Sequence, residues 1–571
     1  MSARKWYLTL VLALALIASA CGPAATAVPT QPSAPQATEP PAPPAGDTPV
    51  PPVTAEPAVL TIGGLGTPDT LNPAYAFLSE SYDVFDLVYS SLVREAPTGE
   101  YVGDLAQEWS ASADGLTWTF TLKDGIVWHD GTPFTVDDIV WSINAVMSNP
   151  DGWATLANYV NGFQEVVALD DETVQITLDA PIGNMEYRLS FLYATSRKDF
   201  EQFETPEDLQ SFLNDAVLGT GPFKMNQFDK DAGVIILDAN EDFFDGRPKI
   251  DQVIIRAFDN ADAMVQALKV GDIDLTTELP NAAFETVKGF PDVQVVQQPS
   301  RSFDELIINS APPDRDPAPS ANPALRDPQV RLAMAHAIHK QDLVDIVLQG
   351  LGSPGTTIVP PTLGGGFWHN GDIQDVEFNL DEANRILDAA GYVLGADGVR
   401  ARGDVRLELR LQYPSDEAVY PRIADLLAEW FGQIGIRLAV ESVDPDTLIA
   451  ACCPAADYDL IIWGWGSDPD PDFILSVMLS DQFVDGGWSD SGYSNPEYDA
   501  LYLAQQAAVD RDERRQIIWQ MQEMAFNDRP YIVLWYSDTL SAYRTDRFTN
   551  FLDSPLGLDS SFSLRQVEPV Q

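Results

Sequence analysis

The sequence predicts an α/β protein made of several domains. Its 571 residues are enough for two to four compact units at roughly 100–200 residues per domain. Apolar residues make up 45% of the chain and charged residues 21%, which is typical of a folded globular body. Segments with strand-like alternation and segments with helical spacing follow one another along the chain, so strands and helices are expected within the same domains.

The first elements of the body are expected near Ala58. The apolar run 59–62 predicts a strand, and the glycine-rich stretch after it predicts a loop. Residues 117–122 alternate between apolar side chains and threonine, which predicts a half-buried strand. Thr135 and Asp138 have the spacing of a capping box, so a helix should follow them and continue to about residue 147.

The later elements predict a parallel sheet. A helix capped by Asn379 should stop at Gly391. Alternation then predicts a strand at 405–412, helical spacing predicts a helix at 419–434, and further apolar runs predict more strands. Strand, helix and strand in this order are typical of a βαβ unit. The remaining predicted elements are strands at 436–443 and 458–463 and a helical stretch at 495–527.

The N-terminus reads as a secretory signal over residues 1–20. Arg4 and Lys5 are followed by an apolar run at 6–17, shorter than the ~20 residues of a membrane-spanning helix. Small residues then precede Cys21, an arrangement that resembles a bacterial lipobox and implies lipidation of this cysteine. The alternative is a plain secreted protein. Residues 21–57 are rich in proline and should form an extended tether.

The other two cysteines are neighbours, Cys452 and Cys453, and neither has a distant partner. The sequence therefore predicts no disulfide framework. Free thiols in a turn before Pro454 are expected, with a bond between the two neighbours as the alternative.

Composition and motifs exclude several functions. Lys and Arg total 33 against 86 Asp and Glu, so the net charge of −53 repels phosphate backbones and no nucleic-acid partner is expected. The chain has no nucleophile elbow, no phosphate-binding loop and no zinc-protease helix. His336 and His339 have helical spacing but no accompanying cluster of ligands. We expect no catalytic residue, no cofactor and no metal site.

Several segments together resemble family 5 of the extracytoplasmic solute-binding proteins, the peptide- and nickel-binding group of ATP-binding-cassette (ABC) importers. The most extensive match is the stretch 105–140, and shorter ones follow in the same order. These segments are Leu105–Trp109, Asp114–Gly125, Trp128–Val140, Gly219–Phe223, Asn240–Pro248, Gly271–Asp274 and Asp327–His339. The resemblance covers about residues 58–560.

This resemblance implies a two-lobed periplasmic-binding-protein type II fold, with a hinge and an extra subdomain on the first lobe. The hinge would lie at chain crossings near residues 311 and 539. The implied parts are lobe I at 58–90, 219–310 and 540–571, the subdomain at 91–218, and lobe II at 311–539.

The resemblance also implies a ligand site between the lobes. In peptide-binding members, an Asp that follows a Trp takes the ammonium group of the ligand. Asp468 matches that position, and Asp470 is the alternative. Trp463 and Trp465 lie on one face of a predicted strand, where they would either line the cleft or pack in the core.

The first lobe is expected to contribute the loop 66–73, with Thr67 and Asn72 as candidates. The backbone of this loop would pair with a peptide as an added strand does. The alternative is a plain turn closed by the Asn72-Pro73 pair.

The function implied is a lipid-anchored receptor that binds a peptide and delivers it to a membrane permease. It would be a monomer and not an enzyme, located on the outer face of the cell membrane or in the periplasm. The alternatives are a receptor for oligosaccharides or nickel complexes, and a cell-surface hydrolase.

Overall fold

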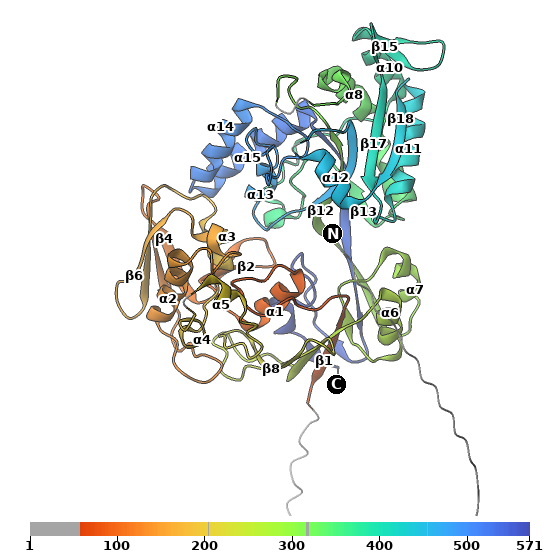
Figure 1. Ribbon diagram of the computed structural model, residues 1–571. Coiled ribbons are helices and arrows are strands. Elements are labelled where there is room, and N and C mark those ends of the chain that lie inside the picture. The colour runs from red at the N-terminus through yellow and green to blue at the C-terminus, as the bar shows by residue number, and fades with distance from the viewer. Residues whose placement is uncertain (1–56, 204, 316–318, 454, 571) are drawn as a thin grey trace, which may run out of the picture. The chain divides into compact units, whose positions relative to one another are not determined.

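The structure is a computed structural model that describes residues 57–203, 205–315, 319–453 and 455–570 (Figure 1). The predicted signal peptide, Cys21 and the tether up to residue 56 lie outside the described residues. Within the described ranges, no helix is both long and apolar enough to cross a membrane.

One sheet of eleven strands runs through the body (Figure 1). In sheet order the strands are β18 (Arg437–Val443), β17 (Glu408–Pro414), β19 (Leu460–Gly466), β12 (Val293–Ile308), β20 (Tyr531–Arg544), β11 (Leu275–Thr276), β1 (Val59–Gly64), β10 (Gln252–Ala257), β9 (Val234–Ala239) and β8 (Phe223–Asp229), with β13 (Gly352–Pro354) also paired to β20.

Strands β12 and β20 are the longest in the sheet, with 16 and 14 residues, and they join its two halves. Residues 293–299 of β12 pair with 538–544 of β20, and residues 303–307 pair with 531–536. The register of the pair shifts between Pro299 and Phe303. A break in pairing of this kind bends a strand locally.

The half of the sheet formed by β1 and β8 to β11 falls in the residues predicted as lobe I. Helices α1 (Ser79–Val88) and α6 (Ala261–Val270) flank it. Helix α6 begins at the capping side chain of Asn260 and ends at Gly271, which has a φ of 83°. A left-handed glycine at this position is the usual way for a helix to stop.

A separate antiparallel sheet forms the core of the subdomain, in the order β4-β5-β7-β6. The predicted strand at 117–122 is β5, whose side chains alternate between buried and half-buried, so that prediction is confirmed. The predicted capping box at Thr135 and Asp138 is also confirmed, and it starts α2 (Val136–Ser148). The other strands are β4 (Ala106–Ala111), β6 (Phe163–Ala168) and β7 (Thr173–Leu178).

Lobe II contains the predicted βαβ unit. Strand β17 pairs in parallel with β18 and with β19, and α11 (Tyr420–Gln433) connects β17 to β18. The predicted helix after Asn379 is α10 (Leu380–Ala389). The single helical stretch predicted at 495–527 is instead two helices, α14 (Pro496–Ala507) and α15 (Arg511–Asp528). Asp510 caps the second helix by accepting a hydrogen bond from the Glu513 amide, which fixes the break.

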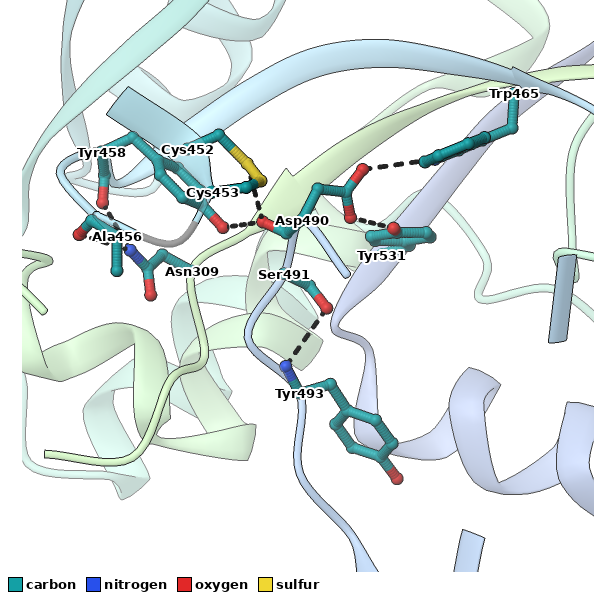
Figure 2. The surroundings of a disulfide bond; sticks show 10 residues. All are labelled: Asn309, Cys452, Cys453, Ala456, Tyr458, Trp465, Asp490, Ser491, Tyr493 and Tyr531. Carbon is teal, nitrogen blue, oxygen red and sulfur yellow. Dashed lines mark hydrogen bonds between the residues drawn. A yellow bond between two sulfur atoms is a disulfide. The ribbon is translucent and has the colours of Figure 1, made fainter. Parts of the chain in front are cut away.

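Cys452 and Cys453 are joined by a disulfide in the structure, so the prediction of free thiols was wrong (Figure 2). Cys452 is the last residue of α12 (Pro445–Cys452), and the backbone at Cys453 is extended. This change of backbone conformation brings the two neighbouring side chains together. The sequence offered no distant partner, but it could not show this local geometry.

Alkylation of the folded protein should therefore leave Cys452 and Cys453 unmodified until a reductant is added. The check is mass spectrometry of the proteolytic peptide that contains both residues, before and after reduction. Labelling of both cysteines in freshly purified, unreduced protein would contradict the disulfide.

Candidate functional site

The predicted site loop follows directly after β19. This strand ends at Gly466, which pairs with Ser302 of β12, and the Ser467 amide donates to the carbonyl of Arg301 at 3.0 Å. The loop therefore starts beside the register shift between β12 and β20. Asp468, the first aspartate of this loop, lies at the junction between the residues predicted as lobe II and those predicted as the subdomain.

Asp468 contacts the subdomain across this junction. The hydroxyl of Tyr187, on α3 (Met185–Phe191), donates a hydrogen bond of 2.8 Å to its carboxylate. Burial raises the pKa of Asp468, and the bond from Tyr187 opposes that shift only in part. The carboxyl group is therefore partly desolvated and has a neutral partner.

Arg301 is a cation whose charge acts on Asp468. It lies on β12 within the register shift, and its guanidinium donates to Glu95 of β2 (Val93–Glu95) at 2.6 Å. The positive charge of Arg301 lowers the pKa of Asp468 and so opposes the effect of burial, but the two side chains form no direct hydrogen bond. Arg301 thus links β12, at the register shift, to the subdomain next to the loop.

Asp470 has a different environment from Asp468. Both of its oxygens accept hydrogen bonds from Arg514 of α15, at 2.5 and 2.6 Å, and both side chains are almost fully buried. Gln505 accepts a further bond from Arg514 at 2.9 Å. Asp470 is therefore occupied within lobe II, where it ties the loop to the helices behind it.

Two adjoining cavities lie on the lobe I side, and the larger one reaches Pro469, the residue after Asp468. The larger, of ≈ 230 Å³, is lined by Pro469 of the loop together with aromatic and acidic side chains and one cation, Arg94, which pairs with Asp86 at 3.6 Å. The smaller, of ≈ 50 Å³, is lined by the end of β1 and by Thr67. The two share Asp83 and Asp559 in their walls.

These shared walls are strongly acidic. Asp83 is exposed as a residue, but its carboxyl group is surrounded by protein atoms. This local desolvation, together with the charges of Asp559 and Asp86, raises the pKa of Asp83 well above its usual value. Burial likewise raises the pKa of Asp559. A cationic group entering these cavities would relieve the repulsion between the carboxylates.

The two lobe I candidates lie in different places. Thr67 lines the smaller cavity. Asn72 is fully buried, and its amide donates to the carbonyls of Leu209 and Phe212 at 2.7 and 2.9 Å. Asn72 therefore anchors the loop to the subdomain, and its side-chain amide is already occupied by these bonds.

Trp463 and Trp465 do lie on the same face of their strand. Both line a cavity of ≈ 230 Å³ within lobe II, which we call the Trp pocket. Its lining residues are Ile307, Leu448, Ile449, Cys452, Cys453, Ile461, Trp463, Trp465, Gly487, Trp488 and Asp490. Figure 2 shows Asp490 between Trp465 and Tyr531.

Sequence reasoning missed Tyr187, Asp83, Asp559 and Asp490. Tyr187, Asp83 and Asp559 are far in sequence from the loop after β19. Asp490 is nearer to it but lies in a stretch without regular structure. In a chain with 86 acidic residues, no local signal separates those that gather around a cavity from those on the surface. Only the fold brings them together.

Replacing Asp470 with Asn should destabilise the folded protein by about 3–5 kcal/mol, because it leaves the buried charge of Arg514 without its partner. The measurement is chemical denaturation of the unliganded protein. Asp404→Asn is the matched control, since Asp404 is exposed and its replacement should change stability by less than about 0.5 kcal/mol. Equal stability of the two variants would show that the buried pair does not hold the loop.

Comparison with known proteins gives consistent matches over most of the chain. The oligopeptide-binding protein AppA of Bacillus subtilis is 25% identical over 482 residues, which cover 84% of this chain and 86% of that protein. The dipeptide-binding protein of Escherichia coli is 23% identical, with 86% of this chain and 91% of that protein covered.

Solved structures match the fold. The substrate-binding protein CtaP of Listeria monocytogenes superposes with a TM-score of 0.77 at 23% identity, covering 90% of this chain and 99% of that one. AppA of Bacillus subtilis in complex with a nonapeptide gives a TM-score of 0.67 at 22% identity, with the same coverage. The predicted two-lobed α/β fold is confirmed by these matches.

The family model described as "Bacterial extracellular solute-binding proteins, family 5 Middle" matches residues 100–485, which is more than half of the chain. This match includes all of the motif segments from which the resemblance was recognised. The chain therefore belongs to the bacterial extracellular solute-binding proteins of family 5.

Proposed function

We propose that this protein is a lipid-anchored extracytoplasmic receptor that binds a peptide between its lobes and delivers it to an ABC permease. The observation that carries the proposal is Asp468, a partly buried carboxyl group at the lobe junction whose direct partner is the neutral Tyr187. Peptide-binding relatives along most of the chain support the same ligand class.

The chemistry of Asp468 suits the ammonium group of a peptide. A carboxylate that is already partly desolvated gains a strong charge-assisted hydrogen bond when a cation reaches it. That gain offsets the cost of burying both charges only if the two groups pair closely. The Tyr187 hydroxyl satisfies Asp468 in the unliganded state, and we infer that the ligand ammonium replaces it or joins it.

The lobe I cavities supply the rest of the proposed site. Thr67 lies in an irregular loop, whose backbone groups are suited to pair with an extended peptide. The acidic walls formed by Asp83 and Asp559 favour the positively charged end of a peptide over anionic solutes. No side chain is assigned to the ligand carboxylate.

Closure of the lobes would use the β12–β20 pair. We propose that the hinge lies at the register shift between Pro299 and Phe303 and at the facing residues of β20. From the sequence we predicted lobe I at 58–90, 219–310 and 540–571, the subdomain at 91–218 and lobe II at 311–539. We propose the same parts with one change: the first crossing lies nearer to residue 300 than to 311, so that residues 303–310 of the chain belong with lobe II. A ligand that contacts both lobes shifts the population towards the closed form.

Nickel complexes and sugars are two other ligand classes that the binding experiment described below would detect. The solved structure of NikZ from Campylobacter jejuni contains Ni(L-His), and it superposes on this chain with a TM-score of 0.69. The tryptophans on β19 would suit a sugar ring. We propose a receptor without turnover, so a peptide should be recovered unchanged after binding.

Replacing Asp468 with Asn should weaken peptide binding by roughly ten- to hundredfold, because a neutral amide cannot form the charge-assisted bond to the ammonium. Calorimetric titration with a mixture of short alanine-based peptides of defined length measures this. N-acetylated versions of the same peptides should bind the unmodified protein as weakly as free peptides bind the variant.

Asp485→Asn is the matched control, because it removes the same charge from an exposed position in the same lobe. Its affinity should equal that of the unmodified protein. Binding of sugars or Ni(L-His) in place of peptides would reassign the ligand class, and hydrolysed peptide in the recovered sample would refute a receptor without turnover.

Replacing Cys21 with Ser should move the protein from the membrane fraction to the soluble extracytoplasmic fraction, because the side chain that would carry the lipid is lost. Fractionation of cells followed by immunoblotting measures this. Cys453→Ser, which leaves the N-terminus intact, is the control and should stay with the membrane. Identical distribution of the Cys21 variant and the unmodified protein would refute lipid anchoring.

A further inference from the structure

The Trp pocket is lined by two tryptophans of β19, and Trp465 lies three residues before Asp468, which is in the loop that follows this strand. Its volume of ≈ 230 Å³ is below the roughly 300–1,000 Å³ of cavities that enclose whole drug-sized ligands. It therefore has room for one side chain of a larger ligand whose backbone lies elsewhere.

The walls of the Trp pocket are mainly apolar. Trp463 and Trp465 are half-buried on one side, Trp488 is 52% exposed at the edge, and the Cys452–Cys453 disulfide adds sulfur to the surface. Indole rings stabilise aliphatic stems by burial and cations through their π faces.

Asp490 is the polar group in this apolar surface. Its carboxylate accepts hydrogen bonds from the Trp465 indole at 3.2 Å and from the Tyr531 hydroxyl, and its carbonyl accepts one from Tyr458 (Figure 2). The Cys452 sulfur lies 3.6 Å from the same carbonyl, but a disulfide sulfur carries no proton, so this is a contact only.

Glu305 is a second carboxyl group beside this pocket. It pairs with Trp463 in the β12–β19 ladder, is fully buried, and neither of its oxygens has a hydrogen-bond partner. Burial, together with the charges of Asp490 and Asp304, raises its pKa well above the usual value. Burial also raises the pKa of Asp490 to about 7, although the bonds from Tyr531 and Trp465 oppose the shift.

No cation compensates these two groups among the described residues. The Asp490 carboxylate is bonded to the neutral side chains of Trp465 and Tyr531, and neither oxygen of Glu305 has a hydrogen-bond partner in that part of the chain. Because Trp465 and Tyr531 already donate their hydrogen bonds to Asp490, the pocket presents an incoming group with a carboxylate, which is an acceptor with negative charge. An anionic side chain would meet repulsion there, whereas a cation would find the missing partner.

We propose that the Trp pocket receives a cationic side chain of the bound peptide, with its alkyl stem against the tryptophans and its ammonium or guanidinium group at Asp490. This selects peptides that contain lysine or arginine, and it rests on the proposed function because the peptide backbone must lie in the neighbouring site. The contact is non-covalent.

The proposal fixes the sign of a pH dependence. A cation binds the ionised form of Asp490, so affinity should rise as the pH increases through about 7. The groups that face Asp490 are Glu305 from β12, Tyr531 from β20, Tyr458 after α12 and Trp465 from β19. Because burial raises the pKa values of both tyrosines well above 10, neither ionises in this range.

The first test uses tetra-alanine peptides in which Lys, Arg, norleucine, citrulline or Glu replaces each position in turn. At one position, Lys and Arg should bind the unmodified protein roughly ten- to hundredfold more tightly than norleucine and citrulline at pH 8. Asp490→Asn should abolish this preference and its pH dependence. Asp485→Asn, an exposed change in the same lobe, should preserve both.

A second variant keeps the test valid if Asp490→Asn folds poorly. Trp488 is exposed enough that Trp488→Ala should fold normally, and it should weaken Lys peptides and norleucine peptides alike by removing a wall of the pocket. Equal affinity for Lys and norleucine at every position, or an Asp490→Asn variant that retains the preference, would overturn the proposal.

A third arm does not depend on peptide binding. Agmatine, an alkyl chain with a guanidinium and an ammonium group, should change the tryptophan fluorescence of the unmodified protein in a saturable way, and less so in Asp490→Asn. If peptides fail to bind but agmatine behaves as expected, the proposed peptide function fails and the cation pocket stands. If agmatine has the same effect on both proteins, the cation pocket fails.

Discussion

Strands β12 and β20 pair over both halves of the large sheet, and the rest of the structure depends on this pair. Each strand contributes hydrogen bonds to lobe I at one end and to lobe II at the other, with the register shift at Pro299–Phe303 between them. Bending two paired strands disturbs few hydrogen bonds, whereas breaking the sheet would cost many. The aspartate loop after β19 starts beside this shift, so any movement there changes the position of Asp468 relative to Tyr187.

The carboxyl groups near the junction have the same chemistry but different surroundings, and the surroundings decide the role of each group. Asp470 is neutralised by Arg514 and stabilises lobe II from inside. Asp468, two residues earlier, has a neutral partner and a raised pKa. Asp490 and Glu305 are buried in the same lobe without a cation among the described residues. Buried acids that lack a cation are costly for stability, and such groups are often found where a ligand supplies the missing charge.

Local patterns predicted local structure well. The alternation at 117–122, the capping box at Thr135 and the strand–helix–strand order after residue 405 are all present, because each depends on neighbours in sequence. The helical stretch after Asn495 was predicted as one helix because hydrophobic spacing does not show that Asp510 starts a new one. The disulfide between Cys452 and Cys453 depends on a backbone change that composition cannot reveal.

The sequence by itself determined the family, the fold class and the loop that reaches the lobe junction, since long motifs and periodic patterns record these directly. Only the tertiary structure decided which aspartates are neutralised and which are not. Tyr187 is 281 residues from Asp468, and Arg514 is 44 from Asp470. The charge of a carboxyl group depends on burial and on partners within a few ångströms, and those partners come from distant parts of the chain that only folding brings together.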